Sequence, residues 1–174
     1  MFKEEKEAPT FDWAMLGDVS AGRPNLGMTM DVVVYRLMQF TMRDIMIVEL
    51  GPEKTDEIMY KAGELAGKEF FKHIISERND FDRFIIELQE KLEMLKVGIL
   101  RIEKVDLENM SFTLAIAEDL DCSGLPMCDE VICTYDEGFI GGLLSSFTGH
   151  DFDVKEVDCW CSGDRVCRFD IKKI

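Results

Sequence analysis

The sequence is short of positive charge, histidine and long apolar runs. It has 20 lysine and arginine residues against 35 aspartate and glutamate residues, so its formal net charge is −15 at pH 7. This balance argues against binding to nucleic acid or to an anionic membrane, because both kinds of partner require a basic face. The two histidines, His73 and His150, are interpreted as surface or capping residues. No stretch of about 18 apolar residues occurs, so we expect no transmembrane helix.

The cysteines are placed unevenly along the chain. The first residues, Met1-Phe2-Lys3-Glu4-Glu5-Lys6-Glu7, lack the apolar core of a signal peptide, so we expect a cytoplasmic protein with reduced thiols. Clustered thiols in a reducing compartment favour a metal site, although ordinary buried thiols or a disulfide are alternatives. No cysteine precedes position 122, and the six that occur are Cys122, Cys128, Cys133, Cys159, Cys161 and Cys167.

Hydrophobic periodicity predicts one α+β domain over residues 15–174, after a flexible tail over residues 1–14. Residues 11–30 are broken by glycines and Pro24, so we expect a short strand or turn there at most. The segment 31–50 is apolar on most sides, which predicts a deeply buried helix. The full order expected is helices near 31–50, 53–75 and 81–97, strands near 100–103 and 110–117, a short helix between Cys133 and Gly149, and strands over 152–161 and 166–171. Helices followed by strands indicate an antiparallel sheet with helices packed on it.

Two glycines lie four residues apart in the second expected helix. Gly63 and Gly67 therefore share one face of it, and each costs about 1 kcal/mol relative to alanine in a helix. Close packing against another helix is the reason we favour for this pair, and space left for a ligand is the alternative.

The last two strands are expected to form a hairpin whose turn lies near Ser162-Gly163-Asp164. A two-residue turn would put Cys167 on the face opposite Cys159 and Cys161. Two different three-residue loops would instead place Cys167 opposite Cys159 or opposite Cys161, and the sequence alone does not choose among the three registers. A β-bulge near residues 156–158 would turn Glu156 and Cys159 to the same side.

This arrangement favours a metal site at the hairpin. Thiolates and a carboxylate are ligands that Zn²⁺ accepts in a tetrahedron, and soft sulfur favours Zn²⁺ over Mg²⁺ or Ca²⁺. Glu156 is a candidate third ligand beside the thiols of the hairpin, and Cys133 is a candidate fourth from the start of the short helix. Four protein ligands leave no position for water, so the metal would stabilise the fold and take no part in catalysis.

The C-terminal segment resembles the signature of the 4-vinyl reductase domain family. The residues that carry the resemblance are Glu156-x-x-Cys159-x-x-x-Gly163-x-x-x-Cys167-x-Phe169. Gly17-Asp18, Arg23-Pro24, Met59-Tyr60-Lys61-Ala62-Gly63, Gly67, Cys133 and the glycine-rich helix from Gly138 to Gly149 are also similar to this family. The resemblance implies a fold similar to the nitric-oxide-signalling and Golgi-transport ligand-binding domains. It also implies Zn²⁺ held by Cys133, Glu156, Cys159 and Cys167, which favours Cys159 over Cys161.

The resemblance further implies a homodimer that binds a hydrophobic small molecule in a sensory or regulatory role. The pocket would lie between helices and sheet, lined by Phe84, Leu88, Phe112, Leu114 and Phe139, although plain core packing also explains these aromatic residues. Phenol-sensing members use a histidine and a tryptophan, whereas this chain has Phe84 and Phe112 near those places, so a phenol hydroxyl would find no partner there.

Two other functions compete with ligand binding. One is an enzyme or accessory factor in vinyl-group reduction of a tetrapyrrole, but the sequence shows no cofactor-binding or catalytic motif, which favours a protein that is not an enzyme. The other is a protein–protein adaptor, as the trafficking relatives of the fold suggest. We see no attached DNA-binding or ATPase domain, so direct transcription activation is not expected.

Overall fold

The computed structural model describes residues 5–128 and 130–174, and its contacts divide the chain into two units, Met1–Asp31 and Val32–Ile174. The first unit contains a 3-10 turn, η1 (Trp13–Leu16), and a single helical turn, α1 (Val19–Gly22). Asp12 and Asp18 accept hydrogen bonds from the first backbone amides of these turns. These caps favour helical turns over the short strand that we considered for this segment.

The second unit is an α+β fold, as predicted. Its helices are α2 (Val32–Leu50), α3 (Pro52–Ile74), α4 (Phe81–Met94) and α5 (Thr134–Thr148), and its strands are β1 (Ile99–Asp106), β2 (Ser111–Ala117), β3 (Phe152–Asp158) and β4 (Cys167–Lys173). Local sequence signals set several ends. Pro52 occupies the first turn of α3, the Asp80 carboxylate caps α4, and Gly149 ends α5 in the left-handed conformation.

The four strands form an antiparallel sheet in the order β1-β2-β4-β3. The register shifts between Glu156 and Asp158, which confirms the bulge expected near residues 156–158. The last strand pair lies in the predicted register that would put Cys159 opposite Cys167, but the pairing ends there, so the connection is longer than the expected three-residue loop. The last pair is Asp158 with Arg168, and a 3-10 turn, η2 (Trp160–Ser162), lies within the connection. The predicted strand over 152–161 was therefore too long, because the chain leaves the sheet before Cys159.

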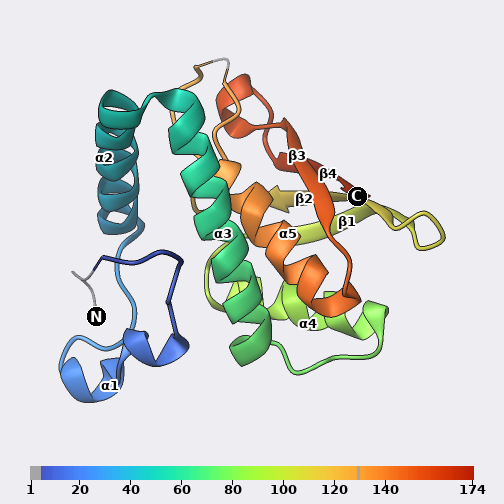
Figure 1. Ribbon diagram of the computed structural model, residues 1–174, viewed down its shortest axis with the longest axis horizontal. Helices are drawn as coiled ribbons and strands as arrows, with labels where there is room; N and C mark the ends of the chain where they lie inside the picture. Colours follow the sequence, from blue (N-terminus) through green and yellow to red (C-terminus); the bar gives the residue numbers. More distant parts are fainter. Residues whose placement is uncertain (1–4, 129) are drawn as a thin grey trace. The chain divides into compact units, whose positions relative to one another are not determined.

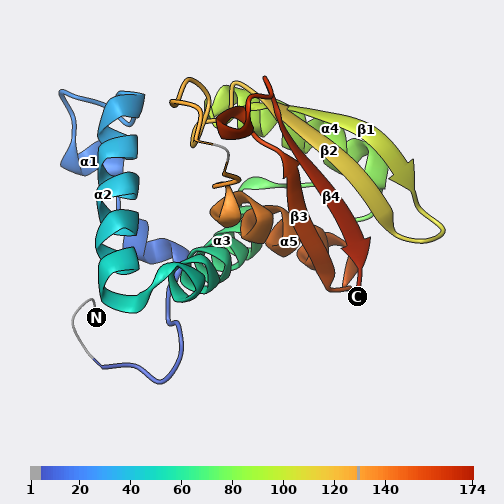
Figure 2. The same ribbon diagram turned by 90° about the horizontal axis from the view of Figure 1, so that it is seen from above.

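Helices α4 and α5 both pack on the face of the sheet that carries Leu114 and Ile116, and α3 packs on α5 (Figures 1 and 2). The contact between α3 and α5 brings two backbones together. A Cβ atom on Gly63 would lie 2.0 Å from the Tyr135 carbonyl oxygen, and one on Gly67 would lie 2.2 Å from that of Phe139. Close helix packing, the reason that we favoured for these two glycines, is confirmed.

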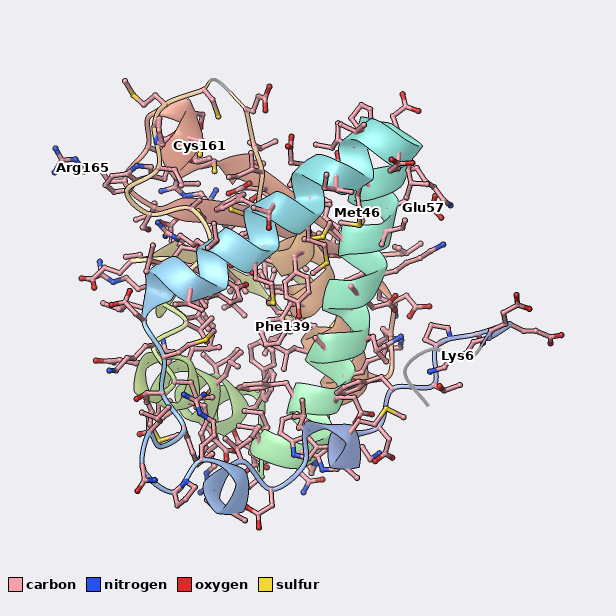
Figure 3. The ribbon with its side chains drawn as sticks, turned by 90° about the vertical axis from the view of Figure 1, so that its left-hand side faces the viewer. Lys6, Met46, Glu57, Phe139, Cys161 and Arg165 are labelled. Carbon is pink, nitrogen blue, oxygen red and sulfur yellow. The ribbon has the colours of Figure 1, made fainter. Side chains whose placement is uncertain are left out.

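The expected deep burial of residues 31–50 was wrong. Helix α2 forms where predicted, but none of its residues is buried. It contacts α3 at one end, where Met46 lies in Figure 3, and it bonds the loop after β2 through Tyr35, Arg36 and Gln39. The large apolar residues of this helix that are exposed are Val32, Val33, Val34, Leu37, Met38, Met42, Ile45, Ile47, Val48 and Leu50.

Candidate metal centre and apolar cavity

Four elements of the second unit bring four cysteine side chains together. Cys122 lies in the loop after β2, Cys133 is the N-cap residue of α5, Cys159 follows the bulge of β3, and Cys167 begins β4. All four are buried, with at most 1% of each residue exposed, and their sulfur atoms lie within 4.8 Å of one another. All six cysteines of the chain are free, so no disulfide joins any of them.

Two of the distances between the sulfur atoms fit a tetrahedral metal site. A Zn–S bond of about 2.3 Å gives a tetrahedron whose sulfur–sulfur edge is about 3.8 Å. The Cys133 sulfur lies 3.9 Å from that of Cys159 and 3.8 Å from that of Cys167, both close to this edge. The sulfur atoms of Cys122 and Cys167 are 2.9 Å apart, which is shorter than the edge and longer than a disulfide bond. Two of these three distances are therefore close to the edge of a tetrahedral thiolate site, and the four sulfur atoms could hold a metal ion.

The electrostatics of the four thiols also suit a cation. Hydrogen bonds from the thiols of Cys122, Cys133 and Cys167 lower the pKa of Cys159, whereas the same network raises the pKa of Cys133. The Cys159 thiolate is thus stabilised at the expense of ionisation at Cys133. A divalent cation would supply the charge that allows all four thiols to ionise, because metal ligation deprotonates a thiol outright.

The resemblance implied Glu156 as a metal ligand. Its carboxylate lies beside the four sulfur atoms but is not part of their group, and it contacts the backbone of Cys133. Its Oε2 accepts a hydrogen bond of 3.1 Å from the Cys133 backbone amide, and its Oε1 is buried without a hydrogen-bond partner among the described residues. Burial is the largest cause that raises the pKa of Glu156 to about 8. The structure thus brings Cys133, Cys159 and Cys167 together with Cys122, a residue that sequence reasoning did not include, and holds Glu156 next to them.

The other two cysteines lie outside this group. Cys161 is buried in η2, and its carbonyl oxygen accepts a hydrogen bond of 2.9 Å from the amide of Cys128, which is exposed. Burial is the largest cause that raises the pKa of the Cys161 thiol to about 12. Neither sulfur belongs to the four-sulfur group.

The loop that carries Cys122 is fixed from two sides. Asp119 accepts hydrogen bonds through Oδ1 from the backbone amides of Asp121, at 2.9 Å, and Cys122, at 3.1 Å. From α2, the Arg36 guanidinium donates to the carbonyl oxygens of Leu120 and Ser123, at 2.7 and 2.9 Å. These contacts hold the backbone of the loop, so the position of the Cys122 sulfur does not depend on the metal alone.

An apolar cavity of about 30 Å³ lies between α4, α5 and the sheet. Three residues of the predicted pocket, Leu88, Leu114 and Phe139, line it. The other two pack in an aromatic cluster instead. The Phe84 ring stacks on Phe147 with centroids 4.4 Å apart, and the Phe112 ring stacks on Phe81 at 5.2 Å. The complete lining is Ile85, Leu88, Leu92, Val97, Leu100, Leu114, Ile116, Asp119, Asp136, Phe139, Ile140, Leu143 and Leu144.

The lining of the cavity contains two acidic residues, which an ordinary apolar core does not. Asp119 precedes Cys122 in the loop after β2, and Asp136 lies in the first turn of α5. One carboxylate oxygen from each lies within 4.8 Å of the other and of the Cys133 sulfur, so the cavity abuts the four-cysteine group. Burial raises the pKa of both carboxyl groups, that of Asp119 to about 6.

No helix among the described residues is long and apolar enough to cross a membrane.

Two sequence relatives are uncharacterized archaeal proteins. An uncharacterized protein of Methanocaldococcus jannaschii is 28% identical over 117 residues, which cover 67% of this chain and 64% of that protein. The chain therefore spans less than two thirds of the length of this relative. A second uncharacterized protein of the same organism is 27% identical over 150 residues, covering 86% of this chain and 81% of that one.

Solved structures with low sequence identity share the fold. A vinyl-4-reductase family protein from M. jannaschii matches with a TM-score of 0.64 at 18% identity, over 96% of this chain and 99% of that one. The phenol-responsive sensory domain of the transcription activator PoxR, solved with phenol, matches with a TM-score of 0.63 at 15% identity, over 84% and 76%. A trafficking protein particle complex subunit 3 from Naegleria fowleri, covalently bound to palmitic acid, matches with a TM-score of 0.64 at 9% identity, over 82% and 95%.

The family follows from a match to the C-terminal part of the chain. The sequence model of the 4-vinyl reductase domain, abbreviated V-4-R, matches residues 112–173, which run from β2 through β4 and contain all four clustered cysteines. The structural match to a vinyl-4-reductase family protein covers nearly the whole chain. The family predicted from the C-terminal cysteine signature is therefore confirmed: residues 112–173 belong to the 4-vinyl reductase domain family.

Proposed function

We propose that this protein is a small-molecule-binding domain with a sensory or regulatory role, stabilised by one structural zinc ion. The observation that carries the proposal is the placement of an apolar cavity directly against a group of four buried cysteines. The fold supports it, because the PoxR sensory domain was solved with phenol and the trafficking subunit is bound to palmitic acid. The lining of the cavity is almost entirely apolar, which suits a hydrophobic ligand.

The zinc ligands that we propose are the sulfurs of Cys122, Cys133, Cys159 and Cys167. The distances from the Cys133 sulfur to those of Cys159 and Cys167 match the tetrahedral edge, and the burial of all four cysteines argues against the open coordination position that a catalytic zinc requires. Glu156 would then lie beside the metal without binding it. Its carboxylate would accept the hydrogen bond from the Cys133 backbone amide and so hold this ligand in place. An ion joining β3, β4, α5 and the loop after β2 would fix one wall of the cavity.

We further propose that a second copy of the chain covers α2. This helix has no buried residue and exposes a set of valine, leucine, isoleucine and methionine side chains along its length. Contiguous exposed apolar surface of this kind marks an interaction site in a protein free in water. Leu37 and Val48, which are 65% and 74% exposed, lie within this set. If α2 instead binds a different protein, the pure chain will be monomeric.

Native mass spectrometry of freshly purified protein tests these proposals together. We expect one zinc ion per chain, a dimer, and an added mass of a small organic molecule that is lost at higher collision energy. Protein that carries zinc but binds no member of a library of small apolar compounds would contradict the ligand-binding function and leave the metal site intact. Protein without metal would contradict the proposed zinc site.

A further inference from the structure

We propose that an open groove between the start of α2, the loop after β2 and the connection from β3 to β4 binds a nucleoside monophosphate. The groove has a volume of about 710 Å³, within the range of about 300–1,000 Å³ that is typical of small-molecule sites. It shares only Asp119 with the apolar cavity and contains none of the four clustered cysteines, so it is a second site, separate from that of the proposed function. Its lining is Val32, Arg36, Lys96, Ala117, Glu118, Asp119, Leu120, Ser123, Gly124, Trp160 and Arg165.

Three cationic side chains line this groove, in a chain whose net charge is −15. Arg36, Lys96 and Arg165 form no ion pair with any carboxylate of the described residues. Among the lining residues Glu118 is the one exposed acid, because Asp119 is 3% exposed. The positive charge in the groove therefore exceeds the exposed negative charge. This balance favours an anionic group, and phosphate is the anion that arginine and lysine pair with most strongly.

The acidic charge of the whole chain does not prevent such binding. At physiological ionic strength, dissolved salt screens exposed charges over about 8 Å, so the charges that contact a bound phosphate dominate its energy. A nucleic acid strand would extend beyond the groove over the acidic remainder of the surface. A single nucleotide lies within the groove, so the local excess of cations favours a mononucleotide over a polymer.

Arg36 is held in place before any ligand binds. Its Nε donates to the Leu120 carbonyl oxygen at 2.7 Å, and one Nη2 hydrogen bond reaches the Ser123 carbonyl oxygen at 2.9 Å. These acceptors are neutral, so the guanidinium keeps its net charge. Its Nη1 has no hydrogen-bond partner among the described residues and can donate to a phosphate oxygen.

Trp160 gives the groove a flat apolar wall. The indole is partly buried against the core, and its Nε1 donates to the Leu125 carbonyl oxygen at 3.0 Å, which fixes the orientation of the ring. Nucleobases stack on aromatic side chains, because every base has a π face. A ligand that joins a flat ring to a phosphate therefore matches both the indole and the three cations.

Two polar side chains in the lining suit a sugar between ring and phosphate. Glu118 and the Ser123 hydroxyl make no side-chain hydrogen bond with the described residues. A carboxylate only accepts hydrogen bonds, whereas a hydroxyl both donates and accepts. The ribose hydroxyls can therefore donate to Glu118 and accept from Ser123. A simple aryl phosphate lacks these donors and would leave the Glu118 carboxylate unpaired near its own negative charge.

The test is isothermal calorimetry of the purified protein in a buffer free of phosphate and sulfate, with three probes. Adenosine monophosphate carries both recognised parts, adenosine lacks the phosphate, and ribose 5-phosphate lacks the base. We expect adenosine monophosphate to bind at least about tenfold more tightly than each of the other two, because each lacks one set of contacts.

A variant with two substitutions, Lys96→Gln and Arg165→Gln, tests the cations. Both side chains are exposed and form no hydrogen bond or ion pair with the described residues, whereas Arg36 holds the loop and is left unaltered. Affinity for adenosine monophosphate should fall by at least about tenfold, and affinity for adenosine should change less than about twofold. The matched control combines Arg101→Gln and Lys104→Gln, which remove the same charge from exposed positions of β1, and it should bind like the unaltered protein.

The outcomes separate this inference from the proposed function. Adenosine monophosphate that binds no more tightly than adenosine, or no more tightly than ribose 5-phosphate, would overturn the inference. An unchanged affinity in the folded variant that lacks Lys96 and Arg165 would do the same. The comparison of probes uses the unaltered protein, so it decides the matter even if that variant does not fold. Failure of the nucleotide to bind would overturn this site alone, because the library screen of small apolar compounds tests the cavity separately.

Discussion

The contact between α3 and α5 can be tested with a single methyl group. In Gly67→Ala the new Cβ would lie 2.2 Å from the Phe139 carbonyl oxygen and 3.0 Å from the Leu143 amide nitrogen, both backbone atoms that cannot rotate away. Alanine is better than glycine in an isolated helix by about 1 kcal/mol, so helix propensity alone predicts stabilisation. Overpacking typically costs about 1–3 kcal/mol, and this contact is severe enough to lie at the upper end of that range.

The net expectation for Gly67→Ala is a loss of about 1–2 kcal/mol in the free energy of unfolding. For a chain of this size that corresponds to a fall of roughly 2–8 °C in melting temperature. Gly141→Ala is the matched control in α5, because its Cβ would meet only the Tyr60 hydroxyl at 3.3 Å and a Val154 methyl at 3.6 Å, both on side chains. Thermal unfolding followed by circular dichroism measures both variants. A Gly67→Ala protein as stable as the Gly141→Ala control would refute the close approach of the two helices.

Three further predictions concern the metal and α2. Removing zinc with a chelator should lower the melting temperature, because an ion that binds only the folded chain stabilises it by mass action; an unchanged melting temperature would contradict a structural role. Cys122→Ser should lower zinc affinity by at least tenfold in a competition titration with a chromophoric chelator, whereas Cys128→Ser should not alter it, since only Cys122 belongs to the four-sulfur group. Leu37→Glu should convert the dimer to a monomer in sedimentation velocity, and the substitution should not destabilise the fold of the single chain. A persistent dimer would place the interface away from α2.

The elements that could be predicted are those whose signals are local. The positions of α3 and α4 follow from their apolar periodicity, from Pro52 and from the Asp80 cap. The bulge in β3 could be predicted because strand parity changes between Val154 and Val157. The spacing of Gly63 and Gly67 favoured a close helix contact over space for a ligand, although it did not identify α5 as the partner helix.

Features that depend on distant contacts could not be predicted in this way. The exposure of α2 was missed because its apolar composition is equally typical of a buried helix and of one that binds a partner. Cys122 was missed because it lies in an irregular loop whose path is set by Asp119 and by Arg36 from α2. The acidic residues beside the cavity were missed for a similar reason, since charge alone does not reveal burial.

The central claim is that four cysteine sulfurs hold one zinc ion. X-ray absorption spectroscopy at the zinc edge of the purified protein tests it most directly, because the first coordination shell reports the number and type of ligand atoms. We predict four sulfur atoms at about 2.3 Å and no oxygen. A shell of three sulfurs and one oxygen would assign the fourth position to Glu156 in place of Cys122, and a protein without bound metal would contradict the claim altogether.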